Sequence, residues 1–114
     1  YCLGTLQEVH QMLYVHFGLD RRYVHTVKGW FNKTLPEYKN KIGKVALLKL
    51  DADWYESVKC CLDNLWDNIV EGGYIYIDDY HLSGCQKAIS EHINNKGIKP
   101  VIYPDGRGGA WFRK

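Results

Sequence analysis

The stretch from Leu50 to Tyr80, LDADWYESVKCCLDNLWDNIVEGGYIYIDDY, decides the fold that the sequence predicts. It contains two acidic clusters, and each follows directly on a short run of β-forming residues, Val45–Leu50 and Tyr74–Ile77. Apolar residues between them recur at helical spacing until Gly72-Gly73. A helix that joins two strands makes them parallel with a right-handed connection, so both clusters are expected at one edge of one sheet. Ligands of open α/β sheets bind at that edge.

The flanking segments predict further elements of an α/β fold with a hairpin at its C-terminal end. The residues from Trp30 to Lys44 are polar and contain Pro36 and Gly43, so this segment is expected to be mostly loop. The nearly continuous apolar run of Val45–Leu50 is typical of a strand that is covered on both faces. Helices are expected at residues 6–17, 55–71 and 83–96, and strands at 23–27, 45–50, 74–77, 98–103 and 110–113.

Composition narrows the class of protein. A chain of 114 residues is one domain at most, and because it begins with Tyr1 we expect a piece of a longer protein. The formal charge is only +2 and the basic residues are scattered, which gives no argument for nucleic acid. No apolar run approaches the roughly 18 residues of a membrane span. Four cysteines without CxxC spacing favour free thiols in a reducing cytoplasm, namely Cys2, Cys60, Cys61 and Cys85.

The two acidic clusters place three carboxylates, Asp51, Asp78 and Asp79, within expected reach of one point. Carboxylate oxygens without His or Cys select hard cations such as Mg²⁺ or Ca²⁺. The structural alternative is that Asp78 and Asp53 cap the helices that follow them and Asp51 is solvated, because Asp is favoured at N-caps. A doublet and a singlet on adjacent strands favour a site over this alternative, whereas Asp53 stands where a cap would stand.

Two further groups have a functional and a structural interpretation. His81 follows the acidic doublet and could act as a general base, or it could be an exposed loop histidine without a role. Gly29, Trp30 and Phe31 follow an expected strand, and the aromatic rings could stack on a flat ring such as adenine or pack in the core. Gly106, Gly108 and Gly109 lack a following helix, so they indicate a tight hairpin turn and not a phosphate loop.

Three segments carry a resemblance to a known family: VKGWFNKTLP (27–36), IGKVALLKLDADWYES (42–57) and EGGYIYIDDYHLSGCQKAI (71–89). In this order they resemble the macrocin O-methyltransferase family, the TylF-like enzymes, over most of the chain. The resemblance implies a class I methyltransferase with a doubly wound, Rossmann-like sheet. It also implies S-adenosylmethionine as cofactor, a divalent metal, typically Mg²⁺, and a small-molecule acceptor whose sugar hydroxyl is methylated.

The resemblance assigns roles to individual residues. Asp51, Asp78 and Asp79 match the metal ligands after the family's fourth and fifth strands. Asp51 is further expected to take part in catalysis, together with His81, and in cofactor binding. Gly29 and Trp30 match the turn after the third strand, which in such folds lies near the adenine of the cofactor.

Part of the family pattern does not appear in this sequence. The first strand with its glycine-rich cofactor loop and the second strand with its acidic residue are absent. We therefore expect residues 1–114 to be the C-terminal part of the domain, with a mostly parallel sheet and an antiparallel C-terminal hairpin. Activity is expected of the full-length protein, and the piece alone is expected to bind cofactor poorly and to be inactive.

Two other functions remain open from the residues. A receiver-like phosphoryl-transfer domain also gathers three aspartates and Mg²⁺ at a sheet edge, but there the acidic pair comes first in the chain. A degenerate, non-catalytic fragment whose aspartates are only caps is the second alternative. Metal titration separates these functions, because a methyltransferase needs the metal for turnover, whereas a degenerate module should not bind the ion appreciably.

Overall fold

The computed structural model describes residues 3–114 and divides into two compact units, one ending at Trp30 and the other spanning Phe31–Lys114. In the first unit, α1 (Leu6–His10) continues into the π-helix η1 (Gln11–His16). A reciprocal capping box begins α1, because Thr5 Oγ1 accepts a hydrogen bond from the Glu8 amide while the Glu8 carboxylate accepts one from the Thr5 amide. The predicted helix over Leu6–Phe17 is thus confirmed.

The strand predicted at residues 23–27 is wrong. These residues have no regular secondary structure, and no strand among residues 3–114 pairs with them. Their backbone groups bond locally: the amides of Tyr23 and Val24 donate to the Asp20 carbonyl, and the Tyr14 hydroxyl donates to the Val24 carbonyl. β-forming side chains make a strand only where a neighbouring strand completes the ladder.

The loop predicted between Trp30 and Lys44 is also wrong, because this segment forms α2 (Phe31–Ile42) with Pro36 inside it. Two observations account for the helix. Leu35 packs against the core of the second unit, and the Asn68 side-chain amide donates to two carbonyls at the helix end, those of Lys39 and Gly43. Packing therefore offsets the cost of the interior proline, which is about 3 kcal/mol or more. Gly43, with φ 72°, follows the helix.

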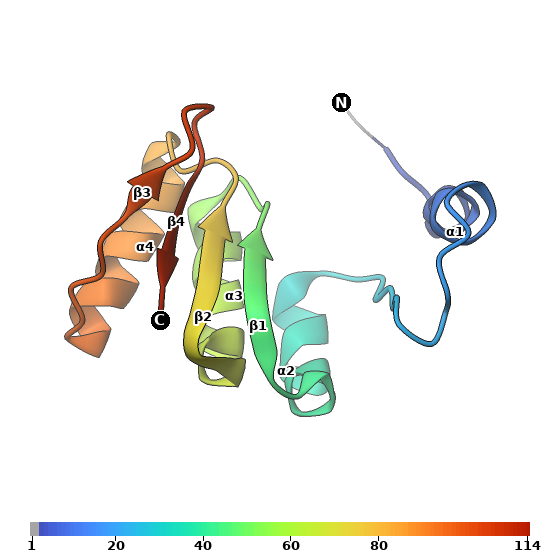
Figure 1. Ribbon diagram of the computed structural model, residues 1–114, viewed down its shortest axis with the longest axis horizontal. Coiled ribbons are helices and arrows are strands. Elements are labelled where there is room, and N and C mark those ends of the chain that lie inside the picture. The colour runs from blue at the N-terminus through green and yellow to red at the C-terminus, as the bar shows by residue number, and fades with distance from the viewer. Residues whose placement is uncertain (1–2) are drawn as a thin grey trace. The chain divides into compact units, whose positions relative to one another are not determined.

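The remaining elements form a mixed sheet with helices on one face (Figure 1). The strands lie in the order β1-β2-β4-β3; β1 and β2 are parallel, and β4 is antiparallel to both of its neighbours. Three strands therefore run in one direction, and the predicted antiparallel C-terminal hairpin is present. The elements are β1 (Val45–Leu50), α3 (Tyr55–Leu65), η2 (Trp66–Asn68), β2 (Ile69–Ile77), α4 (Ser83–Lys96), β3 (Tyr103–Pro104) and β4 (Ala110–Arg113).

The sequence predicted that the helix from Tyr55 ends at Gly72-Gly73, and this is wrong. Both glycines lie inside β2, which begins at Ile69. The register of β1 against β2 shifts between Val45 and Leu47, which marks a bulge. A Cβ on Gly73 would lie 2.8 Å from both the Ile69 side chain and the Val70 carbonyl oxygen. Glycine is therefore required where the strand bends.

The two faces of the sheet differ. The helix face carries Leu50, Ile75, Ile77 and Phe112, each at most 2% exposed, which pack against α3 and α4. The open face carries the alternate residues Leu47, Lys49, Tyr74, Tyr76 and Trp111, which line a hollow of about 360 Å³. Leu47 is 59% exposed, so the expectation that β1 is covered on both faces is wrong. α3 and α4 both lie on the helix face (Figure 1).

Two further predictions concern the state of the cysteines and the presence of a membrane span. Cys60, Cys61 and Cys85 are free thiols, and burial raises the pKa of Cys61 to about 11. Cys2 lies outside the described residues. None of the described helices is long and apolar enough to cross a membrane.

Candidate functional site

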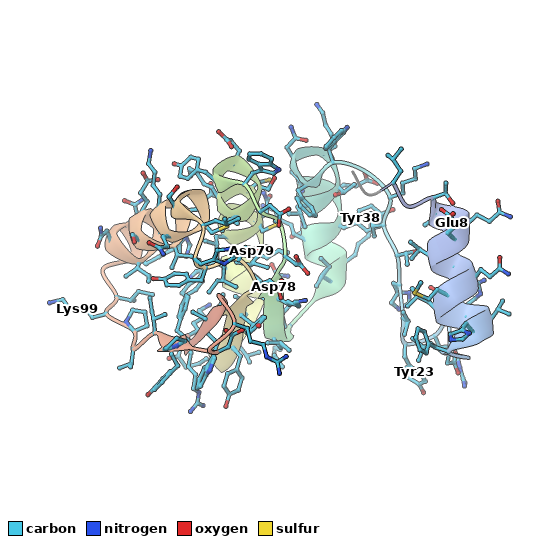
Figure 2. All side chains as sticks on the ribbon, turned by 90° about the horizontal axis from the view of Figure 1, so that it is seen from above. Glu8, Tyr23, Tyr38, Asp78, Asp79 and Lys99 are labelled. Atoms are coloured by element: carbon cyan, nitrogen blue, oxygen red, sulfur yellow. The ribbon has the colours of Figure 1, made fainter. Side chains whose placement is uncertain are left out.

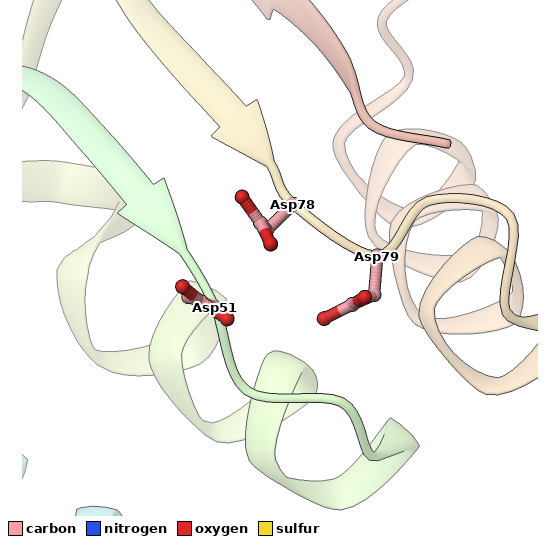
Figure 3. A group of neighbouring side chains, drawn as sticks. All are labelled: Asp51, Asp78 and Asp79. Carbon is pink, nitrogen blue, oxygen red and sulfur yellow. The ribbon is translucent and has the colours of Figure 1, made fainter. Parts of the chain in front are cut away.

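The site is the edge of the sheet where β1 and β2 end. Figure 2 looks down on this edge, where Asp78 and Asp79 are labelled, and Figure 3 shows their carboxylates pointing toward that of Asp51. One oxygen from each of the three side chains lies within 4.8 Å of the others. The Asp78 amide donates to the Leu50 carbonyl at 2.9 Å, and this bond ties the two strand ends together. The sequence-predicted trio is thus brought to one point.

The capping alternative does not hold for these aspartates. The N-cap residues are Trp54 for α3 and Leu82 for α4, and neither helix has a side-chain cap hydrogen bond. Asp53 and Asp78 therefore do not cap the helices that follow them. Their carboxylates are left available for other partners at the sheet edge.

Lys49 supplies a positive charge that sequence analysis did not assign to the site. Its Nζ donates to Asp51 Oδ2 at 3.0 Å and forms an ion pair with Asp78 Oδ1 at 3.3 Å. The Asp51 and Asp78 carboxylates raise the pKa of Lys49. One signal for this residue was present in the sequence, because Lys49 is the charged exception in the apolar run VALLKL.

Asp53 is the second residue that sequence analysis undervalued. Its backbone has φ 57°, the left-handed region that non-glycine residues rarely adopt, and its carbonyl accepts a hydrogen bond from Cys85 Sγ at 3.4 Å. The neighbouring Asp53 carboxyl is the largest cause that raises the pKa of Asp79 above its ordinary value. Burial and the charges of Asp78 and Asp51 contribute in the same direction. Nothing in the sequence indicated the turn that brings Asp53 there.

His81 is held by the C-terminal turn. Its amide donates to the Gly108 carbonyl at 2.8 Å, and its Nδ1 lies 3.1 Å from the same oxygen. Because a carbonyl oxygen only accepts, this contact places a proton on Nδ1, so that in the neutral ring Nε2 carries the lone pair. A Cβ on Gly108 would lie 2.6 Å from His81 Nδ1, so this contact requires glycine.

Gly29 and Trp30, the expected cofactor contacts, belong to the first unit. Gly29 has φ 146°, which favours glycine, and the Trp30 side chain is 82% exposed. The indole is not buried in a core, so the core-packing alternative does not describe Trp30. Phe31 begins α2 and is 42% exposed.

The donor set fits a hard divalent cation. All three side chains offer carboxylate oxygens, and Mg²⁺ and Ca²⁺ prefer oxygen ligands. The three carboxylates are half-exposed or partly buried, so water can complete the coordination shell, as it does at most Mg²⁺ sites. No sulfur or imidazole group belongs to this cluster.

The fold matches that of O-methyltransferases over part of their length. The solved structure of the O-methyltransferase NovP superimposes with a TM-score of 0.88 and 31% identity, over 96% of this chain and 45% of that chain. The structure of CalS11, a TDP-rhamnose 3'-O-methyltransferase of calicheamicin biosynthesis, gives a TM-score of 0.61 over 76% of this chain and 39% of that one. At 23% identity, the second likeness shows the fold alone.

A model of the Macrocin-O-methyltransferase (TylF) family matches residues 3–114, and the chain belongs to this family. One relative, the 8-demethyl-8-(2,3-dimethoxy-alpha-L-rhamnosyl)-tetracenomycin-C 4'-O-methyltransferase of Streptomyces olivaceus, is 36% identical over 83% of this chain and 36% of its own length. Another, the Mycinamicin III 3''-O-methyltransferase of Micromonospora griseorubida, is 29% identical over 98% of this chain and 43% of its own length. The chain thus spans less than half the length of these relatives.

Proposed function

We propose that the protein methylates a sugar hydroxyl of a glycosylated natural product. S-adenosylmethionine is the methyl donor, and a divalent cation activates the acceptor hydroxyl. The observation that carries the proposal is the convergence of Asp51, Asp78 and Asp79 at the carboxyl edge of the sheet, in a chain of the TylF family. The acceptor class is supported by a relative whose name specifies a rhamnosyl group.

Methyl transfer is an in-line displacement, so the acceptor oxygen must be aligned with the methyl carbon and made nucleophilic. Asp51, Asp78 and Asp79 would hold the cation, Mg²⁺ or a similar ion. When bound, such a cation lowers the pKa of a coordinated hydroxyl and stabilises the negative charge on its oxygen. The three side chains come from two strand ends that the Asp78-to-Leu50 hydrogen bond ties together, which favours a fixed position for the acceptor.

A proton acceptor is also required. His81 Nε2 is one candidate, since the Gly108 carbonyl holds the ring with its proton on Nδ1. An oxygen of the carboxylate cluster is the other, and the raised pKa of Asp79 beside Asp53 supports it. Either would accept the hydroxyl proton as the oxygen–carbon bond forms and the bond from the methyl carbon to the sulfur of the donor breaks.

Gly29 and Trp30 are proposed to contact the adenosyl group of the cofactor. An exposed indole presents a flat, polarisable face on which adenine can stack. The positive φ of Gly29 sets the direction in which the chain enters Trp30. Asp51 is proposed to contact the cofactor as well, because it follows β1 at the carboxyl edge of the sheet, where ligands of open α/β sheets bind.

Metal binding by this chain is the direct test. Titration of Mn²⁺, followed by its electron paramagnetic resonance signal, should show one site, and Asp79→Asn should weaken it about tenfold or more. Asp63→Asn is the matched control, because Asp63 is half-exposed and ion-paired to Lys59 on α3, outside the cluster. Equal affinity in wild type and Asp79→Asn would contradict the metal assignment.

The activity is tested in the full-length protein. Transfer of a radiolabelled methyl group from S-adenosylmethionine to a rhamnosylated acceptor should be lost in EDTA and restored by Mg²⁺. Asp79→Ala should reduce the rate by at least a hundredfold at saturating Mg²⁺. The mechanism is wrong if Asp79→Ala retains full activity in EDTA.

A further inference from the structure

Lys49 lies at the acidic site without being a possible ligand for a cation. It belongs to β1, two residues before Asp51, and its side chain lines the hollow on the open face of the sheet. Its Nζ lies 3.0 Å from Asp51 Oδ2 and 3.3 Å from Asp78 Oδ1, which come from two different strand ends. Lys49 therefore bridges two of the three carboxylates that the proposed metal site needs.

An ammonium group and a divalent cation compete for these oxygens. Mg²⁺ binds carboxylate oxygens at about 2.0–2.1 Å, and the ammonium donates to the same atoms. An ion shared by Asp51 Oδ2 and Asp78 Oδ1 would lie close to Nζ, where the charges of +1 and +2 repel. Lys49 thus has to move away from at least one carboxylate before the ion binds both.

The open face provides room for the displaced side chain. The hollow beside Lys49 is lined by Leu47, Tyr74, Tyr76 and Trp111, and the Lys49 side chain is 51% exposed. Aromatic rings attract an ammonium group through their π faces. The aliphatic stem of Lys49 can pack along Leu47 while its charge stays in solvent.

We propose that Lys49 is the resident cation of the acidic site, which holds Asp51 and Asp78 together when no metal is bound and gives way to the divalent ion. Lys49 is then a positioning residue that sets metal affinity. This inference rests on the proposed function, because it assumes that Asp51, Asp78 and Asp79 bind the ion.

Three variants of this chain test the proposal. Lys49→Met keeps the length and apolar character of the stem but removes the charge, and Lys49→Arg restores the charge with a different donor geometry. Lys59→Met is the control, because it also removes one positive charge, from an exposed ion pair with Asp63 that lies on α3. Mn²⁺ affinity is measured for each by electron paramagnetic resonance, and thermal unfolding is followed in EDTA and in saturating Mn²⁺.

We expect Lys49→Met to bind Mn²⁺ about tenfold more tightly than wild type, while Lys49→Arg and Lys59→Met stay within about threefold of it. In EDTA, Lys49→Met should unfold several degrees lower than Lys59→Met, because the three carboxylates then repel one another without a counter-ion. Saturating Mn²⁺ should remove most of this difference.

The outcomes separate the two proposals. If wild type binds Mn²⁺ and Lys49→Met binds it equally or more weakly, the role of Lys49 is refuted and the metal site stands. If neither protein binds Mn²⁺, both proposals fail. Should Lys49→Met not fold in EDTA, refolding on addition of Mn²⁺ supports the inference, and failure to refold with Mn²⁺ refutes it.

Discussion

The two faces of the sheet are built from alternate residues of the same strands, yet they differ in what they contain. On the helix face, Ile75, Ile77 and Phe112 are completely buried. On the open face, Lys49 and the aromatic residues Tyr74 and Trp111 remain partly exposed. The helix face therefore carries the stability of this unit, whereas the open face borders the acidic site at Lys49.

The largest loss of stability is expected from a substitution on the helix face. Phe112→Ala should lower the free energy of unfolding by about 3–5 kcal/mol, because it leaves a cavity in a fully buried site. Trp111→Ala, its neighbour on the open face, should cost only about 1–2 kcal/mol, mainly through its stack on Tyr103 at 4.5 Å. Urea unfolding measures both. Equal losses would show that the two faces contribute alike.

A smaller effect is expected at the turn that joins β3 to β4. Asp105 accepts hydrogen bonds from the Tyr76 hydroxyl at 2.5 Å and from the amides of Arg107 and Gly109, and these bonds hold the pKa of Asp105 below its usual value. Asp105→Ala should lower the unfolding temperature more than Tyr76→Phe, which leaves two of the three bonds intact. A larger loss in Tyr76→Phe would mean that the open face, and not the turn, depends on this contact.

The same contacts give that turn a pH dependence. Because the folded pKa of Asp105 is depressed, its contribution is present above the unfolded value of about 3.9 and is lost as the pH falls through the folded pKa. Unfolding temperatures of wild type and Asp105→Asn should therefore approach each other below pH 4. A constant difference down to pH 2 would contradict this.

The smallest change in stability is expected from the titration of a histidine on the helix side of the sheet. His92 of α4 packs edge-on against Trp66, its Nε2 has no hydrogen-bond partner, and burial lowers the pKa of His92. The charges of Lys96 and Lys59 act in the same direction, while those of Asp63 and Asp67 oppose it. The unfolded chain then binds the proton more readily, so stability should fall as the pH drops below about 6.5. His92→Gln should flatten this dependence in urea unfolding between pH 7 and pH 5.

Prediction from the sequence succeeded where the local pattern and the tertiary structure agree. β1 and β4 have the predicted bounds, and Asp51, Asp78 and Asp79 meet at the expected edge, because strand direction follows from the connecting helix. Prediction failed where residues distant in sequence determine the secondary structure. Leu35 and Asn68 stabilise α2 in spite of Pro36, and the segment at residues 23–27 has no strand to pair with in the part of the chain that the structure describes.

The candidate site shows the same division. The identity of the three carboxylates could be predicted, since acidic residues directly after strands stand out in a sequence. The bridge from Lys49 to Asp51 and Asp78 could not be predicted, nor could the effect of Asp53 on the pKa of Asp79. The contact of Lys49 with Asp78 and that of Asp53 with Asp79 each join residues from two strand ends.

The sequence by itself determined the parallel pair of strands, the antiparallel return and the edge at which the acidic residues gather, because side-chain periodicity and the handedness of connections are local properties of the chain. Only the tertiary structure decided which face of the sheet the helices cover and which charges lie beside the carboxylates. Burial and charge pairing depend on residues far apart in sequence, and a linear pattern does not record how close those residues come.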